Sequence, residues 1–168
     1  MGNLKDDIKG GAEWTINAFE ALEIHLDYSV KSVEHIENLL EEQFKNGQPI
    51  KDGLFSNGMG GKVFSIASYI GEVIIRNTKN TNWEFDQNDP NNEMNMMVSS
   101  KNKSRIWPMQ KLRKRIQNGN KDNIYHYTAI IVKKFNEELN NNEGLINKNA
   151  NQKSEELKNT SKSWWKFW

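Results

Sequence analysis

One segment of this chain is apolar on nearly every side of a helix. Its apolar residues are Val63, Phe64, Ile66, Ala67, Tyr69, Ile70, Val73, Ile74 and Ile75. A helix over residues 62–78 that is apolar all round is normally buried at the centre of a domain. Gly71 in its middle costs about 1 kcal/mol relative to alanine, which indicates that another element passes close by. The segment therefore predicts a central helix around which the other elements pack.

Two amphipathic helices are predicted before this central helix. The first spans about residues 5–23, where apolar side chains recur at steps of three and four residues. The second follows Ser29, a good N-cap, and is expected to end at Gly47. Together they predict a helical hairpin. Its inner faces consist of Ile8, Ala12, Ile16, Phe19 and Leu22 in the first helix and Val30, Val33, Ile36, Leu39, Leu40 and Phe44 in the second.

The periodicity changes after the central helix. Residues 83–85 and 94–96 alternate between apolar and polar side chains, and residues 89–92 between them have the composition of a turn. Residues 104–107 predict a third strand. These segments indicate a small three-stranded antiparallel meander.

Two further helices are predicted to close the domain. Pro108 suits the first turn of a helix over residues 109–118, which Gly119 is expected to end. A last helix is predicted over residues 123–139. The predicted fold class is therefore α+β, with an N-terminal helical hairpin, a central apolar helix, a three-stranded meander and two C-terminal helices.

The chain is expected to divide into one domain and a tail. Residues 1–142 contain all the predicted elements and suit a single α+β domain. Residues 143–168 are polar and low in complexity, and we expect them to be disordered. This tail ends in aromatic residues that would be costly to expose to water, so they are expected to dock on the domain, on a partner or, least expected, at a membrane interface, and the alternative is a mobile end of the tail. These tail residues are Trp164, Trp165, Phe167 and Trp168.

Composition excludes several kinds of site. The sequence has no cysteine, which rules out disulfides, thiolate metal sites and a cysteine nucleophile. No stretch approaches the roughly 20 apolar residues that span a bilayer, so no transmembrane segment is predicted. The first residues lack the apolar core of a secretory signal, and a cytoplasmic protein is expected.

No cofactor or metal is expected. Gly58–Lys62 is rich in glycine, but Ser56 and Val63 stand where a phosphate-binding loop needs glycine and serine or threonine. The three histidines match no spacing that is typical of metal ligands.

Glu72 is unusual because it lies on the otherwise apolar central helix. A buried carboxylate with a raised pKa could act as the general acid or base of a hydrolase. The structural interpretation instead pairs Glu72 with Arg76 one turn later, or with Tyr69. No second carboxylate or histidine has a spacing that would complete a catalytic set. We therefore assign no catalytic residue, and treat these three residues as a polar site in the core.

The distribution of charge gives the clearest indication of a partner. Residues 101–121 carry eight basic and no acidic side chains, whereas residues 1–47 carry ten acidic and four basic ones. The bases could contact nucleic-acid phosphates or an acidic protein surface, complement the acidic N-terminal helices, or form a solvated face of the domain. On the helix over 109–118, Leu112 and Ile116 would face inward and the charged residues outward. The predicted basic surface consists of Lys101, Lys103, Arg105, Lys111, Arg113, Lys114 and Arg115.

Several short segments together resemble an uncharacterised bacterial family of small cytosolic domains. In that family an L-D-Y-S helix start is followed by a G-x-Y-x-G-E-like helix, a strand with tryptophan, and a strand that enters a proline-led basic helix. The matching segments are Leu26–Ser29, Ser68–Glu72, Trp83, and Ile106–Pro108 with Arg113, Arg115 and Gly119; Ala67 replaces the first glycine. The resemblance implies an α+β fold and no established activity. Because some such domains accompany bacterial toxin systems, it also raises an immunity-like binding role.

These observations predict a non-catalytic protein-binding module, immunity-like in kind, that uses the basic surface and the aromatic tail. Nucleic-acid binding through the same basic surface is the alternative, and a hydrolase that uses Glu72 is a third hypothesis. The net charge of +1, with Trp107 as the only aromatic residue in the basic stretch, counts against nucleic-acid binding.

Overall fold

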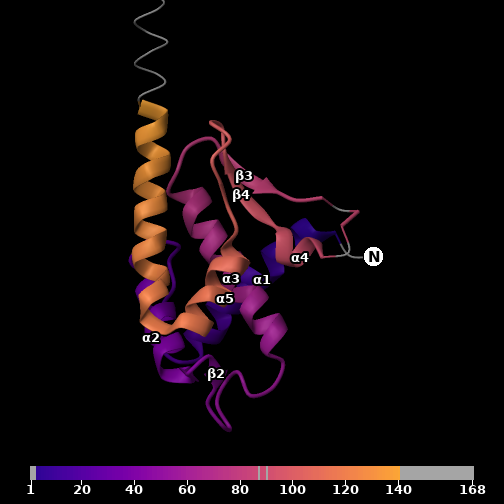
Figure 1. The fold of residues 1–168 in the computed structure, drawn as a ribbon, viewed down its shortest axis with the longest axis vertical. Helices are drawn as coiled ribbons and strands as arrows, with labels where there is room; N and C mark the ends of the chain where they lie inside the picture. Colours follow the sequence, from indigo (N-terminus) through magenta and orange to yellow (C-terminus); the bar gives the residue numbers. More distant parts are fainter. Residues whose placement is uncertain (1–2, 87, 90, 141–168) are drawn as a thin grey trace, which may run out of the picture.

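The computed structural model describes residues 3–86, 88–89 and 91–140. It confirms the predicted α+β class, with one antiparallel sheet of strands β1 and β2 and another of order β3-β4-β5. The last helix, residues 124–140, runs along one side of the molecule (Figure 1). The other elements are α1 (Leu4–Glu20), α2 (Val33–Gln43), β1 (Phe44–Lys45), β2 (Gln48–Pro49), α3 (Met59–Arg76), β3 (Thr81–Glu84), α4 (Asn92–Asn95), β4 (Met97–Ser100), β5 (Arg105–Ile106), α5 (Pro108–Asn118) and the 3-10 turn η1 (Gly119–Asp122).

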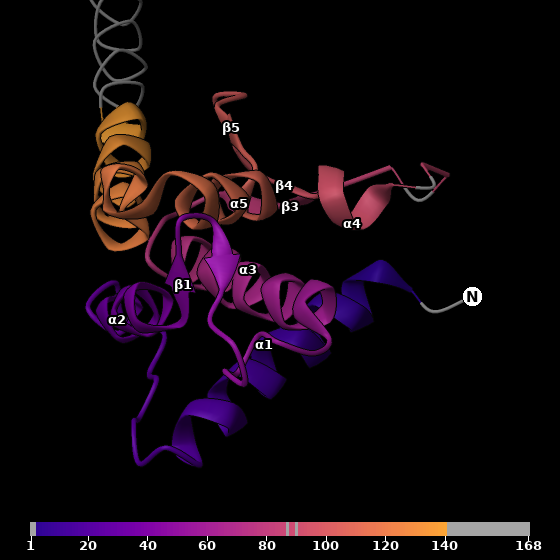
Figure 2. The same ribbon diagram turned by 60° about the horizontal axis from the view of Figure 1, so that its bottom comes forward.

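Helix α3 occupies the centre of the molecule, as its apolar sequence predicts. Figure 2 shows α3 between α1 on one side and α5 with the three-stranded sheet on the other. Its side chains Tyr69, Ile70 and Ile74 are fully buried. Each fully buried side chain of this size contributes roughly 1.5–3 kcal/mol relative to exposure. The core therefore lies on both sides of α3, between this helix and α1 and between this helix and α5 with the three-stranded sheet.

Two glycines allow backbone and side chains to approach closely in this core. A Cβ atom on Gly71 would lie 2.0 Å from the ring of Trp83 on β3, so only glycine fits there. On α1, a Cβ atom on Gly11 would lie 3.2 Å from the Cα atom of Ser65. The predicted close approach at Gly71 is confirmed, and Gly11 lets α1 lie directly on α3.

The predicted helical hairpin does not form a packed unit. Helix α1 packs mainly along α3. Figure 2 shows that α1 and α2 are separate and do not run along each other. Leu22, which was expected on the inner face, is 53% exposed because α1 ends at Glu20. Helix α1 therefore packs on α3 rather than on α2.

Both ends of α2 differ from the prediction. The helix begins at Val33, and the Ser29 hydroxyl accepts a hydrogen bond from the Ser32 amide at 3.1 Å in the preceding turn. It ends at Gln43 rather than at Gly47. Asn46 and Gly47 instead connect β1 to β2, with φ values of 53° and 77°. Two positive φ values in a two-residue Asn-Gly connection are the signature of a hairpin turn.

The three-stranded meander is confirmed, but its middle strand lies further along the chain. Met94–Met96 was expected as a strand, whereas residues 92–95 form α4 and the strand β4 begins at Met97. The Asp89 carboxylate accepts hydrogen bonds from the Asn91 amide at 2.8 Å and from the Asn95 side chain at 2.7 Å. These local bonds favour a helical turn over the extended conformation that the alternating pattern predicts.

The two closing helices agree with the prediction. Pro108 stands at the start of α5, and Gly119 follows the helix with a φ of 67°. Within the described ranges, no helix is long and apolar enough to cross a membrane. The predicted tail, 143–168 with its four aromatic residues, lies outside the described residues.

Candidate functional site

Three cations of the predicted basic surface are paired with carboxylates of the same chain, Arg105 at the surface and Lys111 and Arg115 in more buried positions. The Arg105 guanidinium donates to both carboxylate oxygens of Glu84, at 2.8 and 3.1 Å. The ammonium of Lys111 donates to Asp122 at 2.6 Å. Each bond holds the pKa of the accepting carboxyl, Glu84 or Asp122, below its usual value.

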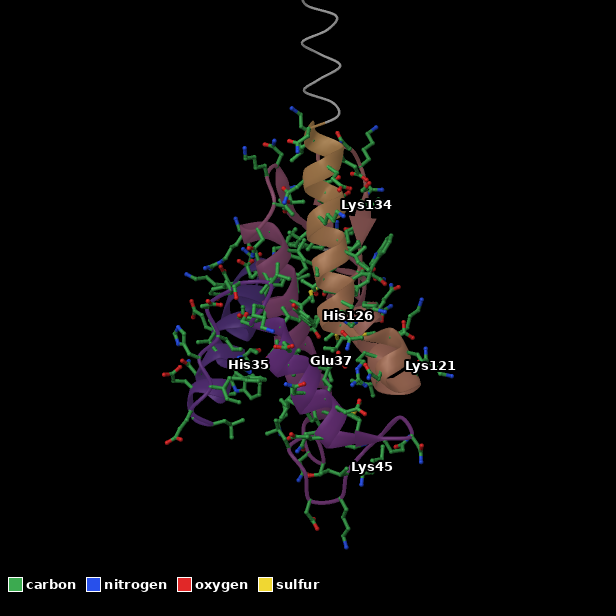
Figure 3. The ribbon with its side chains drawn as sticks, turned by 90° about the vertical axis from the view of Figure 1, so that its left-hand side faces the viewer. His35, Glu37, Lys45, Lys121, His126 and Lys134 are labelled. Atoms are coloured by element: carbon green, nitrogen blue, oxygen red, sulfur yellow. The ribbon has the colours of Figure 1, made fainter. Side chains whose placement is uncertain are left out.

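Arg115 is the third neutralised cation, and its predicted outward position is wrong. Its side chain is only 2% exposed and donates to Glu37 and Glu41, both at 2.6 Å. Glu37 also accepts the amide hydrogen of Ile124 at 2.7 Å. Figure 3 shows Glu37 where α2 faces the start of the last helix. Arg115 and Glu37 therefore join α2, α5 and the last helix.

Four cations of the predicted surface remain exposed or part-exposed at two separate places. Lys101 and Lys103 lie in the turn between β4 and β5, while Arg113 and Lys114 lie on α5. Among the residues the structure describes, none of the four has a carboxylate within ion-pair distance. The basic stretch therefore does not form one continuous surface.

Arg113 lies where two neighbouring cavities meet along α5. One cavity, of about 460 Å³, is lined by polar side chains, and the other, of about 390 Å³, is mostly apolar. Both cavities are lined by Met94, Arg113 and Gln117, so they lie side by side, and we describe them together as two halves of one groove. We call it the α5 groove. Its other lining residues include Asn91, Asn95, Gln110 and Lys114 in the polar half and Met59, Gly60, Val63, Met109 and Ile116 in the apolar half.

The α5 groove combines positive charge with a flexible apolar surface. Arg113 and Lys114 supply the charge, and among the residues that the structure describes no carboxylate lines either cavity. Met59, Met94 and Met109 form much of the apolar half. Methionine side chains adapt their shape to different apolar partners. The arrangement suits an occupant that is apolar at one end and anionic at the other.

Glu72 is engaged in structural contacts, as the structural interpretation expects. Its carboxylate accepts the indole hydrogen of Trp83 at 2.9 Å and is paired with Arg76 at 3.4 Å. Arg76 in turn stacks on the ring of Tyr28, with 3.5 Å between the guanidinium carbon and the ring centroid. This cluster holds β3 and the 26–29 segment against α3, and it leaves no free general acid or base at Glu72.

Tyr69 lies in a different hydrogen-bond network from Glu72. Its hydroxyl accepts the amide hydrogen of Tyr28 at 3.0 Å and is bonded to the Ser32 hydroxyl at 2.6 Å. Tyr28 has a φ of 61°, so these bonds hold a backbone conformation that is unusual outside glycine. The two segments that carry the family resemblance thus meet at Tyr28 and Tyr69, in a structural role.

The other candidate patterns also have structural roles. The ammonium of Lys62 donates to the carbonyl oxygens of Leu54 and Asn57, at 2.6 and 2.8 Å, and so closes the preceding loop. In the described part of the chain, no group of three His, Cys, Asp or Glu side chains could hold a metal ion. Figure 3 shows His35 on α2 and His126 on the last helix, on different elements.

Sequence reasoning identified Arg113 and Lys114 but missed the apolar half of the groove. Met59, Met94 and Met109 come from three different helices, so no periodic pattern connects them. The glycines at the start of α3 did not mark the groove either, because Gly60 lines it and the neighbouring Gly61 does not.

Comparison of the chain with protein-family models, with curated proteins and with solved structures finds no match. The case for a function therefore depends on the geometry of the groove.

Proposed function

We propose that this protein is a non-catalytic protein-binding module that contacts an acidic partner through the side of α5 that carries Arg113 and Lys114. One observation carries the proposal. Three neighbouring cations have carboxylate partners within the fold, whereas Arg113 and Lys114 line a groove that contains no carboxylate. Charges left unpaired at a depression raise the rate and the selectivity of association with a partner of opposite charge.

Nucleic-acid binding, the alternative, has weaker support. A nucleic acid presents a row of phosphates and requires cations spaced along its path. Here Arg105, Lys111 and Arg115 are paired with carboxylates of the same chain, and the remaining cations are divided between the β4–β5 turn and α5. A hydrolase at Glu72 has less support still, because that carboxylate is bonded to Trp83 and Arg76.

A more specific version of this proposal is that the protein has an immunity-like role. It is supported by the family resemblance and by the groove, since an immunity protein neutralises a toxin by binding it. A toxin encoded by a neighbouring gene would be the first candidate partner to test.

The proposal is tested by recovering partners with the tagged full chain from its native cells and identifying them by mass spectrometry. Charge reversal at the groove, Arg113→Glu with Lys114→Glu, should remove the specific partner. The matched control makes the same change in charge in the β4–β5 turn, Lys101→Glu with Lys103→Glu, and should retain it.

Two results would overturn the proposal. One is a partner that both double variants retain equally. The other is a partner that disappears on treatment with nuclease, because the contact would then depend on nucleic acid.

A further inference from the structure

We propose that the α5 groove binds a single acidic, amphipathic peptide segment of the partner protein. Apolar side chains of the segment would occupy the methionine-lined half, and its carboxylates would pair with Arg113 and Lys114. This inference rests on the proposed function and specifies the ligand of the same site.

The apolar half has the properties of a side-chain pocket. Met59 and Met94 are only partly buried, while Met109 is 5% exposed. The three methionines come from α3, α4 and α5, so this half of the groove is built by three elements. Leucine, methionine or aromatic side chains gain about 25 cal/mol per Å² on entering such a surface.

The cationic half selects for carboxylates. Arg113 can bind a carboxylate through two parallel hydrogen bonds, and Lys114 adds a second positive charge. Both side chains are exposed, and within the described ranges neither has a carboxylate at ion-pair distance. An acidic segment would therefore meet cations that need not first be released from internal partners.

The amides of the polar half favour a peptide over a phosphate chain. Asn91, Asn95, Gln110 and Gln117 line this half, and each carboxamide can donate and accept hydrogen bonds. A peptide backbone offers both N–H donors and C=O acceptors, whereas a phosphate only accepts. Gln110 and Gln117 are separated by two turns of α5, about 10 Å, which matches a short segment.

Gly60 leaves the apolar half open. It lies on α3, and a Cβ atom there would meet nothing within 4 Å. Because Gly60 lines the apolar half, a larger side chain at this position would occupy part of that space.

Charge argues against the C-terminal segment of the same chain as the occupant. Residues 162–168 include Lys162 and Lys166 and no acidic residue. They would place like charges beside Arg113 and Lys114, which is unfavourable. A partner segment with carboxylates has no such penalty.

The test uses a display library of random short peptides selected on the full chain. Selected peptides should combine Asp or Glu with a large apolar residue. Gly60→Leu, which fills the apolar half, should weaken binding of the best synthetic peptide by about tenfold or more in calorimetry. The control Gly61→Leu adds the same side chain where a Cβ also meets nothing within 4 Å and which does not line the groove, and it should leave affinity unchanged. Circular dichroism verifies that both variants fold.

A second selection reverses the charge of the groove. On the Arg113→Glu, Lys114→Glu variant, the library should yield peptides with Lys or Arg in place of Asp and Glu. Selection of the same acidic peptides would overturn the inference.

The remaining outcomes distinguish this inference from the proposed function. If the natural partner is lost on charge reversal but retained by Gly60→Leu, the protein-binding function stands and the groove is not the peptide site. If peptides bind only after Trp164, Trp165, Phe167 and Trp168 are changed to serine, the groove belongs to the chain's own C-terminal segment, and the inference is wrong.

Discussion

Replacing glycine with alanine is expected to have opposite effects on stability at two positions of α3, Gly71 and Gly61. The ring of Trp83 occupies the space beside Gly71, and its hydrogen bond to Glu72 holds it there. Gly71→Ala should lower the free energy of unfolding by about 1–3 kcal/mol, because the cost of overpacking exceeds the roughly 1 kcal/mol that alanine gains in a helix. Urea denaturation of the full chain measures the change.

Gly61→Ala is the matched control for this prediction. A Cβ atom at Gly61 meets nothing within 4 Å, so the helix preference acts alone. The control should raise the free energy of unfolding by up to about 1 kcal/mol. Equal shifts in the same direction at Gly61 and Gly71 would show that Trp83 does not restrict the site.

Arg115 shows where residue-level reasoning from the sequence was wrong. It follows Leu112 by three residues, so helical periodicity alone places both on the inner face of α5. Only its charge argued for an outward position. The deciding information was the acceptor Glu37, which lies far away in the sequence and which no local pattern reveals. Arg113 and Lys114, with no such acceptor, were placed correctly on the exposed face.

At the level of elements, the sequence predicts best where one signal dominates. Helix α3 is apolar on most sides, and α5 has both a proline start and a glycine end. The end of α2 was missed because Asn46–Gly47 resembles both a helix stop and a hairpin turn. Strand β4 was shifted because the bonds of Asp89 override the alternation of the methionines.

The packing of the last helix against α5 predicts sensitivity to high pH. Burial raises the pKa of Tyr127 to about 12. The folded chain therefore holds this proton more tightly than the unfolded chain, in which tyrosine titrates near pH 10. Stability should fall as the pH rises from about 10 to 12.

Tyr127→Phe isolates this contribution, because phenylalanine keeps the ring and cannot ionise. Its free energy of unfolding should fall less between pH 10 and 12 than that of the unchanged protein. Denaturation at pH 7 measures any separate effect on packing. Parallel curves for the two proteins above pH 10 would contradict the proposed role of Tyr127.

Across the whole molecule, the basic stretch of 101–121 has two roles. One part is internal: Arg115 meets the acidic helix α2, which is one of the interpretations that the charge asymmetry left open. The other part, with Arg113 and Lys114, faces the α5 groove. The fold separates these roles by helix face, since consecutive residues of α5 point in different directions.

Glu37 and Arg115 should contribute to the stability of the fold as a pair rather than as two independent residues. Glu37→Met leaves Arg115 buried with Glu41 alone and removes the acceptor of the Ile124 amide. Loss of one partner from a buried ion pair costs about 3–5 kcal/mol. We expect a loss near the lower end of that range, because Glu41 remains, measured as the free energy of unfolding in urea.

The double variant, Glu37→Met with Arg115→Met, removes both charges and fills the site with apolar side chains. It should be more stable than Glu37→Met alone, because no uncompensated charge stays buried, and a double-mutant cycle then gives a favourable coupling energy. The Ile124 amide loses its acceptor in both variants, so this loss does not account for the difference. If the losses of unfolding free energy in Glu37→Met and in Arg115→Met simply add in the double variant, the two residues act independently. The pair then does not join α2, α5 and the last helix as one unit.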